Sequence, residues 1–269
     1  MPGEGRIPVS VLILARDEES VIGPAIRSAA FAREVVVVDS GSADRTREIA
    51  RDLGARVVET DWPGDYGAAR SRAETFASCD WVFHLDADER VSPELADEIG
   101  AFFARGDHEN CPVTKIPLKD IAFGKWIRHG GWYPQHKKRL YRKGSGAWTG
   151  RVHERFETAG PMRVFQGAIV HESFTSVSVV IDKINRYSTL DATTACAEGQ
   201  RFSLFKLFFV PLERFFGRYV RHGGWRDGFH GFVLAALIGL NYFFRHLKIW
   251  EARKRERREA TERGETGRP

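Results

Sequence analysis

The sequence contains few cysteines for its length: three in 269 residues, at Cys79, Cys111 and Cys196. They are odd in number and far apart, and no two form a CxxC pair. This pattern argues against a disulfide framework and a structural zinc site, and it favours reduced thiols in a cytosolic compartment. The first apolar run, Val9 to Ala15, has no cleavage site of small residues, so it predicts a buried strand and not a signal peptide.

The sequence also lacks a long uninterrupted apolar segment. The run from Phe229 to Phe244 holds sixteen residues, whereas a membrane-spanning helix needs about 20. The net charge is +5, and the excess lies in residues 201–269, which hold 15 Lys and Arg against 7 Asp and Glu. A segment that is both basic and apolar predicts amphipathic helices lying in a membrane interface. A buried helix or a dimer interface is the alternative.

The first 120 residues alternate apolar runs with helix-like segments. The run Val35–Val38 shows no apolar–polar alternation, as expected of a parallel strand covered on both faces. Ser92 followed by Pro93 predicts a helix start. This order predicts an α/β fold with an open, mostly parallel, doubly wound, Rossmann-like sheet. The four strands are expected at Val9–Leu14, Val35–Val38, Ala55–Glu59 and Trp81–Leu85.

The pattern changes after Cys111. Lys115–Leu118 predicts an edge strand because it contains Pro117, which cannot donate to a ladder. Residues 123–175 are rich in Gly, Trp, His and Arg, and they predict an acceptor-binding half of loops and short strands.

Polar clusters follow three of the predicted strands, at residues 16–19, 39–42 and 86–89. Ligands of open α/β sheets bind at the carboxyl ends of strands, so we expect these clusters to converge on one crevice. Asp86 and Asp88 can both reach one Mg²⁺ or Mn²⁺ ion. Such an ion would stabilise a diphosphate leaving group. The alternative is a solvated loop whose carboxylates cap the next helix.

Three further residues are candidates for donor binding. Asp39 can accept hydrogen bonds from ribose hydroxyls or a base N–H, although a turn aspartate is the alternative. Asp17 has a similar but weaker case. Arg70 can face the diphosphate, but arginines on such a helix are often only solvated.

At these positions the sequence resembles family 2 glycosyltransferases. Residues 9–19 resemble the opening segment of that family, with Asp17 where the family usually has Asn. Residues 35–44 (VVVVDSGSAD) match its second nucleotide-binding segment, and residues 80–89 (DWVFHLDADE) match its metal segment. The resemblance implies a GT-A fold. The candidate donor-binding residues are Ala15, Asp17, Glu18, Asp39, Arg70, Asp86 and Ala87.

Later segments are similar to the lipopolysaccharide core β-glucosyltransferases of that family. They are residues 139–142 (RLYR), 148–154 (WTGRVHE), 171–173 (HES) and 227–232 (DGFHGF). The resemblance covers residues 8 to about 250, and it implies transfer of glucose from a UDP-sugar to an inner-core heptose.

The acceptor-binding half supplies the remaining candidates. Glu154 is the candidate general base, which must be a carboxylate or imidazole beside the acceptor hydroxyl. Its alternative is an ion pair with Arg151 or Arg155. His171 is a candidate third metal ligand beside Asp86 and Asp88, or a structural histidine. Four aromatic residues of this half predict either a stacking platform for sugar rings or a minor core, and the sequence favours neither. They are Trp126, Trp132, Tyr133 and Trp148.

The sequence therefore predicts an inverting hexosyltransferase that uses a divalent cation. We expect a GT-A domain over 7–200, with its donor half at about 7–110 and its acceptor half at about 111–200. Interfacial helices are expected over 201–250 and a charged, disordered tail over 251–269. The expected partners are a UDP-sugar, a lipid-linked saccharide and the inner face of the cytoplasmic membrane, with no nucleic acid; a second copy of the chain is a further candidate. A polyprenyl-phosphate or protein acceptor, or a non-catalytic nucleotide- or nucleic-acid-binding module, are the alternatives.

Overall fold

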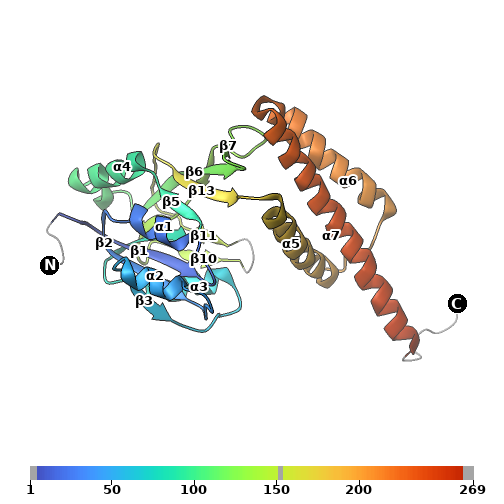
Figure 1. The fold of residues 1–269 in the computed structure, drawn as a ribbon, viewed down its shortest axis with the longest axis horizontal. Helices are drawn as coiled ribbons and strands as arrows, with labels where there is room; N and C mark the ends of the chain where they lie inside the picture. The colour runs from blue at the N-terminus through green and yellow to red at the C-terminus, as the bar shows by residue number, and fades with distance from the viewer. Residues whose placement is uncertain (1–4, 151–153, 263–269) are drawn as a thin grey trace. The chain divides into compact units, whose positions relative to one another are not determined.

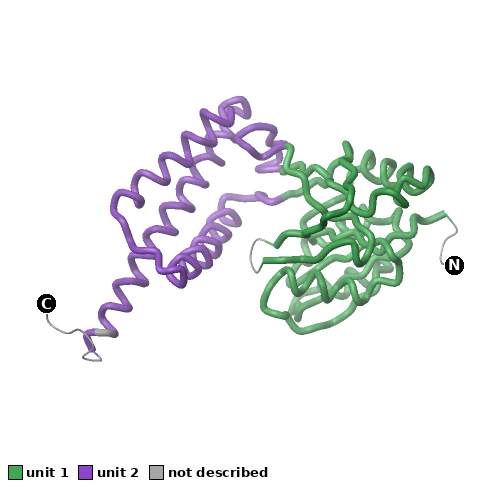
Figure 2. Tube along the Cα trace, turned by 180° about the vertical axis from the view of Figure 1, so that it is seen from behind, with its two compact units in different colours: residues 1–120, 134–172 green, residues 121–133, 173–269 purple. Residues whose placement is uncertain are grey.

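A computed structural model describes residues 5–150 and 154–262 (Figure 1). The chain forms two compact units, and each unit combines two separate stretches of sequence (Figure 2). Unit 1 comprises residues 1–120 and 134–172, and unit 2 comprises residues 121–133 and 173–269. The functional boundaries expected near residues 110 and 200 stay predictions.

Unit 1 contains the parallel sheet that the apolar runs predict. Strands β3, β2, β1 and β4 are neighbours in that order, and each pair is parallel. The chain winds outward from β1 to β3 and then crosses to the other side of β1 to form β4. A crevice for ligands is expected at such a reversal of strand order. The bounds are Ile7–Ala15 for β1, Ala32–Asp39 for β2, Arg56–Glu59 for β3 and Trp81–Asp86 for β4.

Both faces of this sheet are covered, which explains the continuous apolar runs. Val11 and Ile13 of β1 belong to a core that includes side chains of α1, α2 and α4. Leu12 belongs to a second core with Ala73 of α3. The doubly wound α/β fold is thus confirmed. The helices are α1 (Ile22–Ser28), α2 (Thr46–Asp52), α3 (Tyr66–Glu74) and α4 (Pro93–Ala104). Ser92 caps α4 as predicted, because its Oγ accepts a hydrogen bond of 3.2 Å from Leu95 N.

The sheet continues beyond β4 through antiparallel and mixed pairings. The order runs on through β9 (Leu140–Arg142), β6 (Val113–Ala122), β13 (Ile169–Phe174) and β5 (Glu89–Val91). The strand with Pro117 was expected at an edge, and that prediction is wrong, because β6 lies between β9 and β13. β6 is long, and several short strands pair with different parts of it. The missing N–H of Pro117 therefore affects only one position of this ladder.

The remaining strands of the described chain are short. β7 (Lys125–Trp126), β8 (Gln135–Lys137) and β12 (Met162–Val164) each pair with β6. β10 (Ala147–Thr149) and β11 (Arg155–Glu157) form a separate antiparallel pair. Trp148 lies opposite Phe156 in this pair, and both side chains belong to or pack against the second core.

Unit 2 is helical apart from its short strand segments. It contains α5 (Val177–Ala197), α6 (Leu204–Phe216) and α7 (Phe229–Glu262). A π-helical turn (Gly217–Arg221) and a 3₁₀ turn (Gly224–Asp227) join α6 to α7. α7 runs alongside both α5 and α6 (Figure 1). The helix continues through the charged residues to Glu262, so the part of the expected tail that the structure describes is helical.

The DGFHGF segment has a structural role in unit 2. Asp227 is buried, and its carboxylate accepts hydrogen bonds from the backbone N–H groups of Arg128 (3.2 Å) and His129 (2.8 Å). Gly231 lies so close to Gly224 that a Cβ atom at position 231 would lie 1.8 Å from the Gly224 carbonyl oxygen. The segment therefore fixes the start of α7 against residues 125–130.

His84 makes the stability of unit 1 depend on pH. Its ring is fully buried in β4 beside Tyr141 and Trp148, and burial lowers its pKa to about 4, against the opposing effect of Glu74. The unfolded chain takes up this proton near pH 6.5 and the folded chain does not, so stability falls as pH drops from 6.5 toward 4. We expect a loss of about 2 kcal/mol between pH 6.5 and 5 from this group alone.

Urea unfolding of the wild type and of His84→Gln at pH 7, 6 and 5 measures this contribution. The free energy of unfolding of the variant should fall less steeply with acid. Parallel curves for the two proteins would contradict the assignment.

Candidate active site

The loops that follow β1 and β2 are joined by side-chain hydrogen bonds. Asp17 Oδ1 accepts a hydrogen bond of 2.7 Å from Ala43 N, and Asp17 N donates to Ser42 Oγ at 2.9 Å. Glu18 N donates to Thr46 Oγ1 at 2.8 Å. The backbone of Asp17 has φ = +56°. Asp and Asn are among the few non-glycine residues that tolerate this conformation. The first two predicted clusters therefore lie together.

Asp39 is fully buried at the end of β2, and its carboxylate is engaged within the following turn. Oδ1 accepts hydrogen bonds from Gly41 N (3.1 Å) and Ser42 N (3.0 Å), and Oδ2 accepts one from Ser42 Oγ. Arg47 Nε lies 3.8 Å from Oδ1. These contacts are those of a turn aspartate, and contact with a nucleotide stays a prediction. Ala15 ends the neighbouring strand, and its carbonyl accepts a hydrogen bond from Ser40 N at 3.0 Å.

Asp86, at the end of β4, lies between two arginines. Arg70 Nη2 is 2.7 Å from Asp86 Oδ1, and Arg139 Nη2 is 2.6 Å from Oδ2. Both arginines are buried. Burial alone would raise the pKa of Asp86, but the guanidinium groups of Arg139 and Arg70 outweigh it and hold this pKa well below its usual range. Asp86 is therefore an ionised anchor for two cations, with Ala87 buried directly after it.

Glu89 is a fourth member of this cluster that the sequence argument did not single out. It is 1% exposed, its Oε2 accepts a hydrogen bond of 2.9 Å from Asp86 N, and Arg139 Nη2 lies 3.3 Å from its Oε1. Burial raises the pKa of Glu89 despite the nearby Arg139, and the charge of Asp86 adds to the rise. The signals in the sequence were the acidic residue closing DADE and the arginine opening RLYR.

Asp88 points to a different partner, His171 of β13. Asp88 Oδ2 lies 3.2 Å from His171 Nε2, and Asp120 Oδ1 lies 2.8 Å from His171 Nδ1. Burial disfavours the charged imidazole, but the two carboxylates outweigh it and raise the pKa of His171 to about 10. The structure thus brings together two of the three predicted metal ligands, adds Asp120, and directs Asp86 toward arginines.

The Asp88 carboxylate and the His171 Nε2 atom lie 3.2 Å apart, and they would offer oxygen and nitrogen donors to a divalent cation once the imidazole had lost its proton. A carboxylate on the other ring nitrogen, as Asp120 provides, is the usual second partner of a metal-binding histidine. Among the described residues there is no group of three or more His, Cys, Asp or Glu that could hold a metal ion. A cation here would therefore take its further ligands from substrate phosphates and water.

Glu154 directly precedes β11 and contacts the same arginine as Asp86. Arg70 Nη2 lies 3.0 Å and Arg70 Nε 3.2 Å from Glu154 Oε1. Residues 151–153, which include the alternative partner Arg151, lie outside the described part of the chain. The only ion pair described for Glu154 among residues 5–150 and 154–262 is with Arg70, and not with the other alternative partner, Arg155. Arg70 thus joins the end of β4 to the start of β11.

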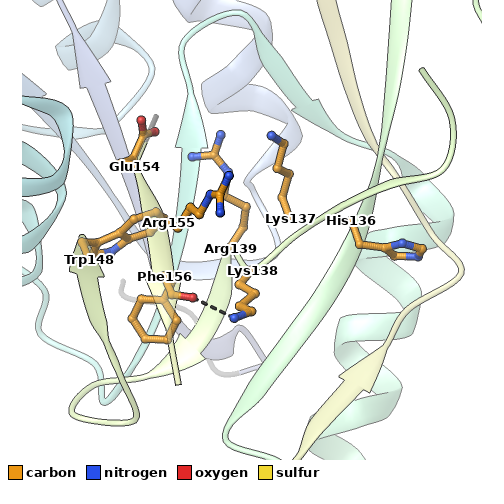
Figure 3. A pocket seen from close by; sticks show the side chains of 8 residues that line it. All are labelled: His136, Lys137, Lys138, Arg139, Trp148, Glu154, Arg155 and Phe156. Atoms are coloured by element: carbon orange, nitrogen blue, oxygen red, sulfur yellow. Dashed lines mark hydrogen bonds between the residues drawn. The ribbon is translucent and has the colours of Figure 1, made fainter. Parts of the chain in front are cut away.

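Glu154 lines a pocket of about 300 Å³ in unit 1. Figure 3 shows Glu154, Lys137 and the guanidinium group of Arg139 directed to the same side of this pocket, with His136 directed away from them. Lys138 Nζ donates a hydrogen bond of 2.8 Å to the Phe156 carbonyl. The pocket combines one carboxylate with several cations and two aromatic rings. Its lining residues are His136, Lys137, Lys138, Arg139, Trp148, Glu154, Arg155 and Phe156.

The four aromatic residues expected to form one platform do not share one unit. Trp148 belongs to unit 1 and packs with Tyr141 and Phe156. Trp126 and Tyr133 contact each other in unit 2, with ring centroids 5.2 Å apart. Trp148 is therefore the platform candidate that lines the pocket with Glu154.

Comparison with known proteins gives a consistent result. Residues 10–164 match the model of glycosyl transferase family 2. An uncharacterised glycosyltransferase of Rickettsia typhi is 31% identical over 90% of this chain and 87% of its own length. The lipopolysaccharide core biosynthesis glycosyltransferase LpsC of Rhizobium meliloti is 30% identical over 91% of this chain and 93% of its own length.

A solved structure with partial similarity is glucosyl-3-phosphoglycerate synthase from Mycobacterium tuberculosis, in complex with Mn²⁺, UDP and glucosyl-3-phosphoglycerate. It is 27% identical, with a TM-score of 0.36. The match covers 41% of this chain and 44% of that one.

The parallel sheet and the acidic cluster at its carboxyl edge define a nucleotide-sugar glycosyltransferase. The chain belongs to glycosyl transferase family 2, as the match over residues 10–164 and the full-length relatives show. The predicted family is thus confirmed.

Arg139 is predicted to be essential for the stability of unit 1. Arg139→Ala removes the shared cation of Asp86 and Glu89 and leaves the buried carboxyl group of Glu89 and the half-buried carboxylate of Asp86 with less compensation. Breaking such a pair costs about 3–5 kcal/mol, so the free energy of unfolding should fall by about that amount. Arg142→Ala, three residues further on and exposed, is the control, with an expected change within about 0.5 kcal/mol. Equal stabilities of the two variants in urea would show that Arg139 is not a structural cation.

Proposed function

We propose that this enzyme transfers a hexose, glucose from UDP-glucose, with inversion to a lipid-linked saccharide of the lipopolysaccharide core. The observation that carries the proposal is the position of Arg70, which hydrogen-bonds both Asp86 and Glu154. The candidate base therefore lies one side chain away from the acidic segment that ends β4. The similarity to LpsC, named for lipopolysaccharide core biosynthesis, supports this class of acceptor.

In the proposed reaction Glu154 acts as general base. Its carboxylate accepts the proton of the acceptor hydroxyl while that oxygen attacks the anomeric carbon from the face opposite the diphosphate. The bond between the anomeric carbon and the diphosphate oxygen breaks, UDP leaves with the bonding electrons, and the configuration inverts. Asp88 and His171 would hold a divalent cation, which would supply positive charge to the diphosphate.

Arg70 is proposed to contact the donor as well as to position Glu154. Its Nη1 atom is buried and has no hydrogen-bond partner within the described chain, although the rest of the guanidinium group is bound to Asp86 and Glu154. An unpaired buried donor is costly. A phosphate oxygen of the sugar nucleotide would satisfy it. Asp17, Glu18 and Asp39 stay candidates for the nucleotide end of the donor.

The proposed site of action is the inner face of the cytoplasmic membrane, and α6 supports it. One side of α6 and its following turn is apolar and exposed, which is unusual in a soluble protein. This α6 stripe comprises Leu204, Phe205, Phe208, Phe209, Leu212, Phe216 and Val220, each more than half exposed. Among the described helices, α7 is long and apolar enough by length and composition to cross a membrane over Phe229–Glu259. Because α7 packs along α5 and α6, we place the helices in the interface with the α6 stripe in lipid.

Two variants separate donor activation from proton transfer. Asp88→Ala should lower both UDP-glucose hydrolysis and glucosyl transfer by at least about 100-fold, because the cation loses a ligand. Glu154→Gln should keep the KM for the donor and lower kcat for transfer by about 100- to 10,000-fold, because only the base is lost. Release of UDP by purified protein with Mn²⁺ or Mg²⁺ measures both. If Asp88→Ala still transfers glucose, Asp88 does not hold a required cation. If Glu154→Gln loses donor binding to the same extent as transfer, Glu154 is not the general base.

The α6 stripe is predicted to attach the protein to membranes. Phe205 and Phe209 stack on each other with ring centroids 4.9 Å apart. Burying each in lipid contributes at least about 1.5 kcal/mol, so Phe205→Asp with Phe209→Asp should lower vesicle binding by at least about tenfold. Met162→Asp with Val164→Asp makes the same charge change at exposed apolar positions of β12 in unit 1 and should bind like the wild type. Equal vesicle binding by the wild type and both double variants would show that α6 does not attach the protein to the membrane.

A further inference from the structure

Unit 2 contains a second pocket that the proposed reaction does not use. It has a volume of about 730 Å³ and lies between the α5–α6 connection and the C-terminal half of α7. Gly199, Arg201 and Phe202 form one side, and the other side consists of Trp250, Arg253, Lys254, Glu256 and Arg257. Four of these eight residues are basic and two are aromatic.

Arg253 fixes the shape of this pocket. Its Nη2 donates hydrogen bonds of 3.0 Å to the carbonyls of Cys196 and Gln200, which end α5 and lead into the connection. Its Nη1 lies 2.7 Å from Glu256, so the one carboxylate of the lining is already neutralised. Arg253 therefore holds the two sides of the pocket together, and the other cations of the lining take no part in these contacts.

The three remaining cations give the pocket a net positive charge. Within residues 5–150 and 154–262, no ion pair is formed by Arg201, Lys254 or Arg257. Lys254 Nζ lies 5.1 Å from the ring centroid of Trp250, which is 42% exposed. Converging cations with open donors are suited to a phosphate group, and an exposed Trp beside them is typical of a surface that meets lipid headgroups.

The pocket lies at the beginning of the α6 stripe. Arg201 and Phe202 line the pocket, Ser203 caps α6, and Leu204 and Phe205 open the stripe at 63% and 69% exposure. Cations and apolar side chains thus follow each other directly along the chain. A phospholipid presents the same order, with a phosphate at the surface and acyl chains below it. A soluble phosphate compound or a nucleic acid would leave the apolar part of this surface in water.

We propose that this pocket binds the phosphate of an anionic phospholipid headgroup, while the α6 stripe enters the acyl layer beside it. The proposal rests on the membrane location given under the proposed function, and it adds lipid selectivity to that location. The stripe provides attachment to any bilayer, and the pocket provides the preference for anionic lipid. The position of the pocket also determines which end of the helical unit faces the headgroups.

Sedimentation of the full-length protein with two kinds of vesicle tests the proposal. One kind contains phosphatidylcholine alone and the other phosphatidylcholine with phosphatidylglycerol. The test variant is Arg201→Glu with Arg257→Glu, and the control is Arg255→Glu with Arg258→Glu, exposed residues of α7 outside the pocket. Thermal unfolding followed by circular dichroism verifies that both variants fold. We expect the test variant to lose about tenfold or more of its binding to anionic vesicles and to bind neutral vesicles like the wild type. The control should keep most of its preference.

Other outcomes overturn the proposal in distinguishable ways. Equal losses for the two variants would mean that general charge attraction, and not the pocket, selects the lipid. If the test variant binds both vesicles like the wild type but loses thermal stabilisation by inorganic phosphate, the pocket is a site for free phosphate. If its only loss is binding to a single-stranded oligonucleotide, the ligand is nucleic acid. If the wild type binds neither kind of vesicle, both the pocket proposal and the membrane location are wrong. UDP release with a detergent-dispersed acceptor tests glycosyl transfer independently of both.

Discussion

The candidate active site depends on buried charge compensation at the end of β4. Asp86 and Glu89 carry carboxyl groups into the interior of unit 1, and Arg70 and Arg139 lie against them. A buried carboxylate without a partner would be strongly destabilising, so each of these residues constrains the others. Arg139 directly precedes β9, and Arg70 lies in α3. The parallel sheet, the start of β9 and the start of β11 are thereby held together by the same ionic cluster.

This arrangement gives the two aspartates of the DAD segment different environments. In a continuous strand residues 86 and 88 would point to the same face, but Ala87 and Asp88 form the turn between β4 and β5. Asp86 consequently faces two guanidinium groups, whereas Asp88 faces His171 and, through it, Asp120. One carboxylate organises the protein's own cations and the other remains suited to an added cation. A site of this kind can bring a sugar diphosphate and a base together without a preformed cage of protein ligands.

Unit 2 shows a structural role for a segment that the sequence analysis connected with a family branch. The DGFHGF segment places Asp227 under two backbone N–H groups and packs Gly231 against Gly224. These contacts fix α7, along which α5 and α6 lie. The apolar surface of α6 therefore faces outward on a rigid support, and the basic pocket near Arg201 belongs to the same unit.

The sequence by itself determined the parallel sheet and its helices, because apolar runs without alternation predict strands covered on both faces and glycine and proline mark their ends. The motifs that follow these strands determined the family. The sequence also identified Asp86, Asp88 and His171 as polar residues at the ends of predicted strands, and Glu154 as a carboxylate of the loop-rich half. It misplaced the strand containing Pro117, since the neighbours of a strand depend on pairings between distant segments.

Only the tertiary structure decided which of these polar residues are partners. Arg70 and Glu154 are 84 positions apart in the chain, and so no local pattern could pair them. Glu89 closes the DADE segment, but its partner Arg139 became recognisable only in the structure, as did the contact of Asp120 with His171. The physical reason is that the energy of a buried charge depends on the groups around it in space, and the order of residues along the chain does not fix that environment.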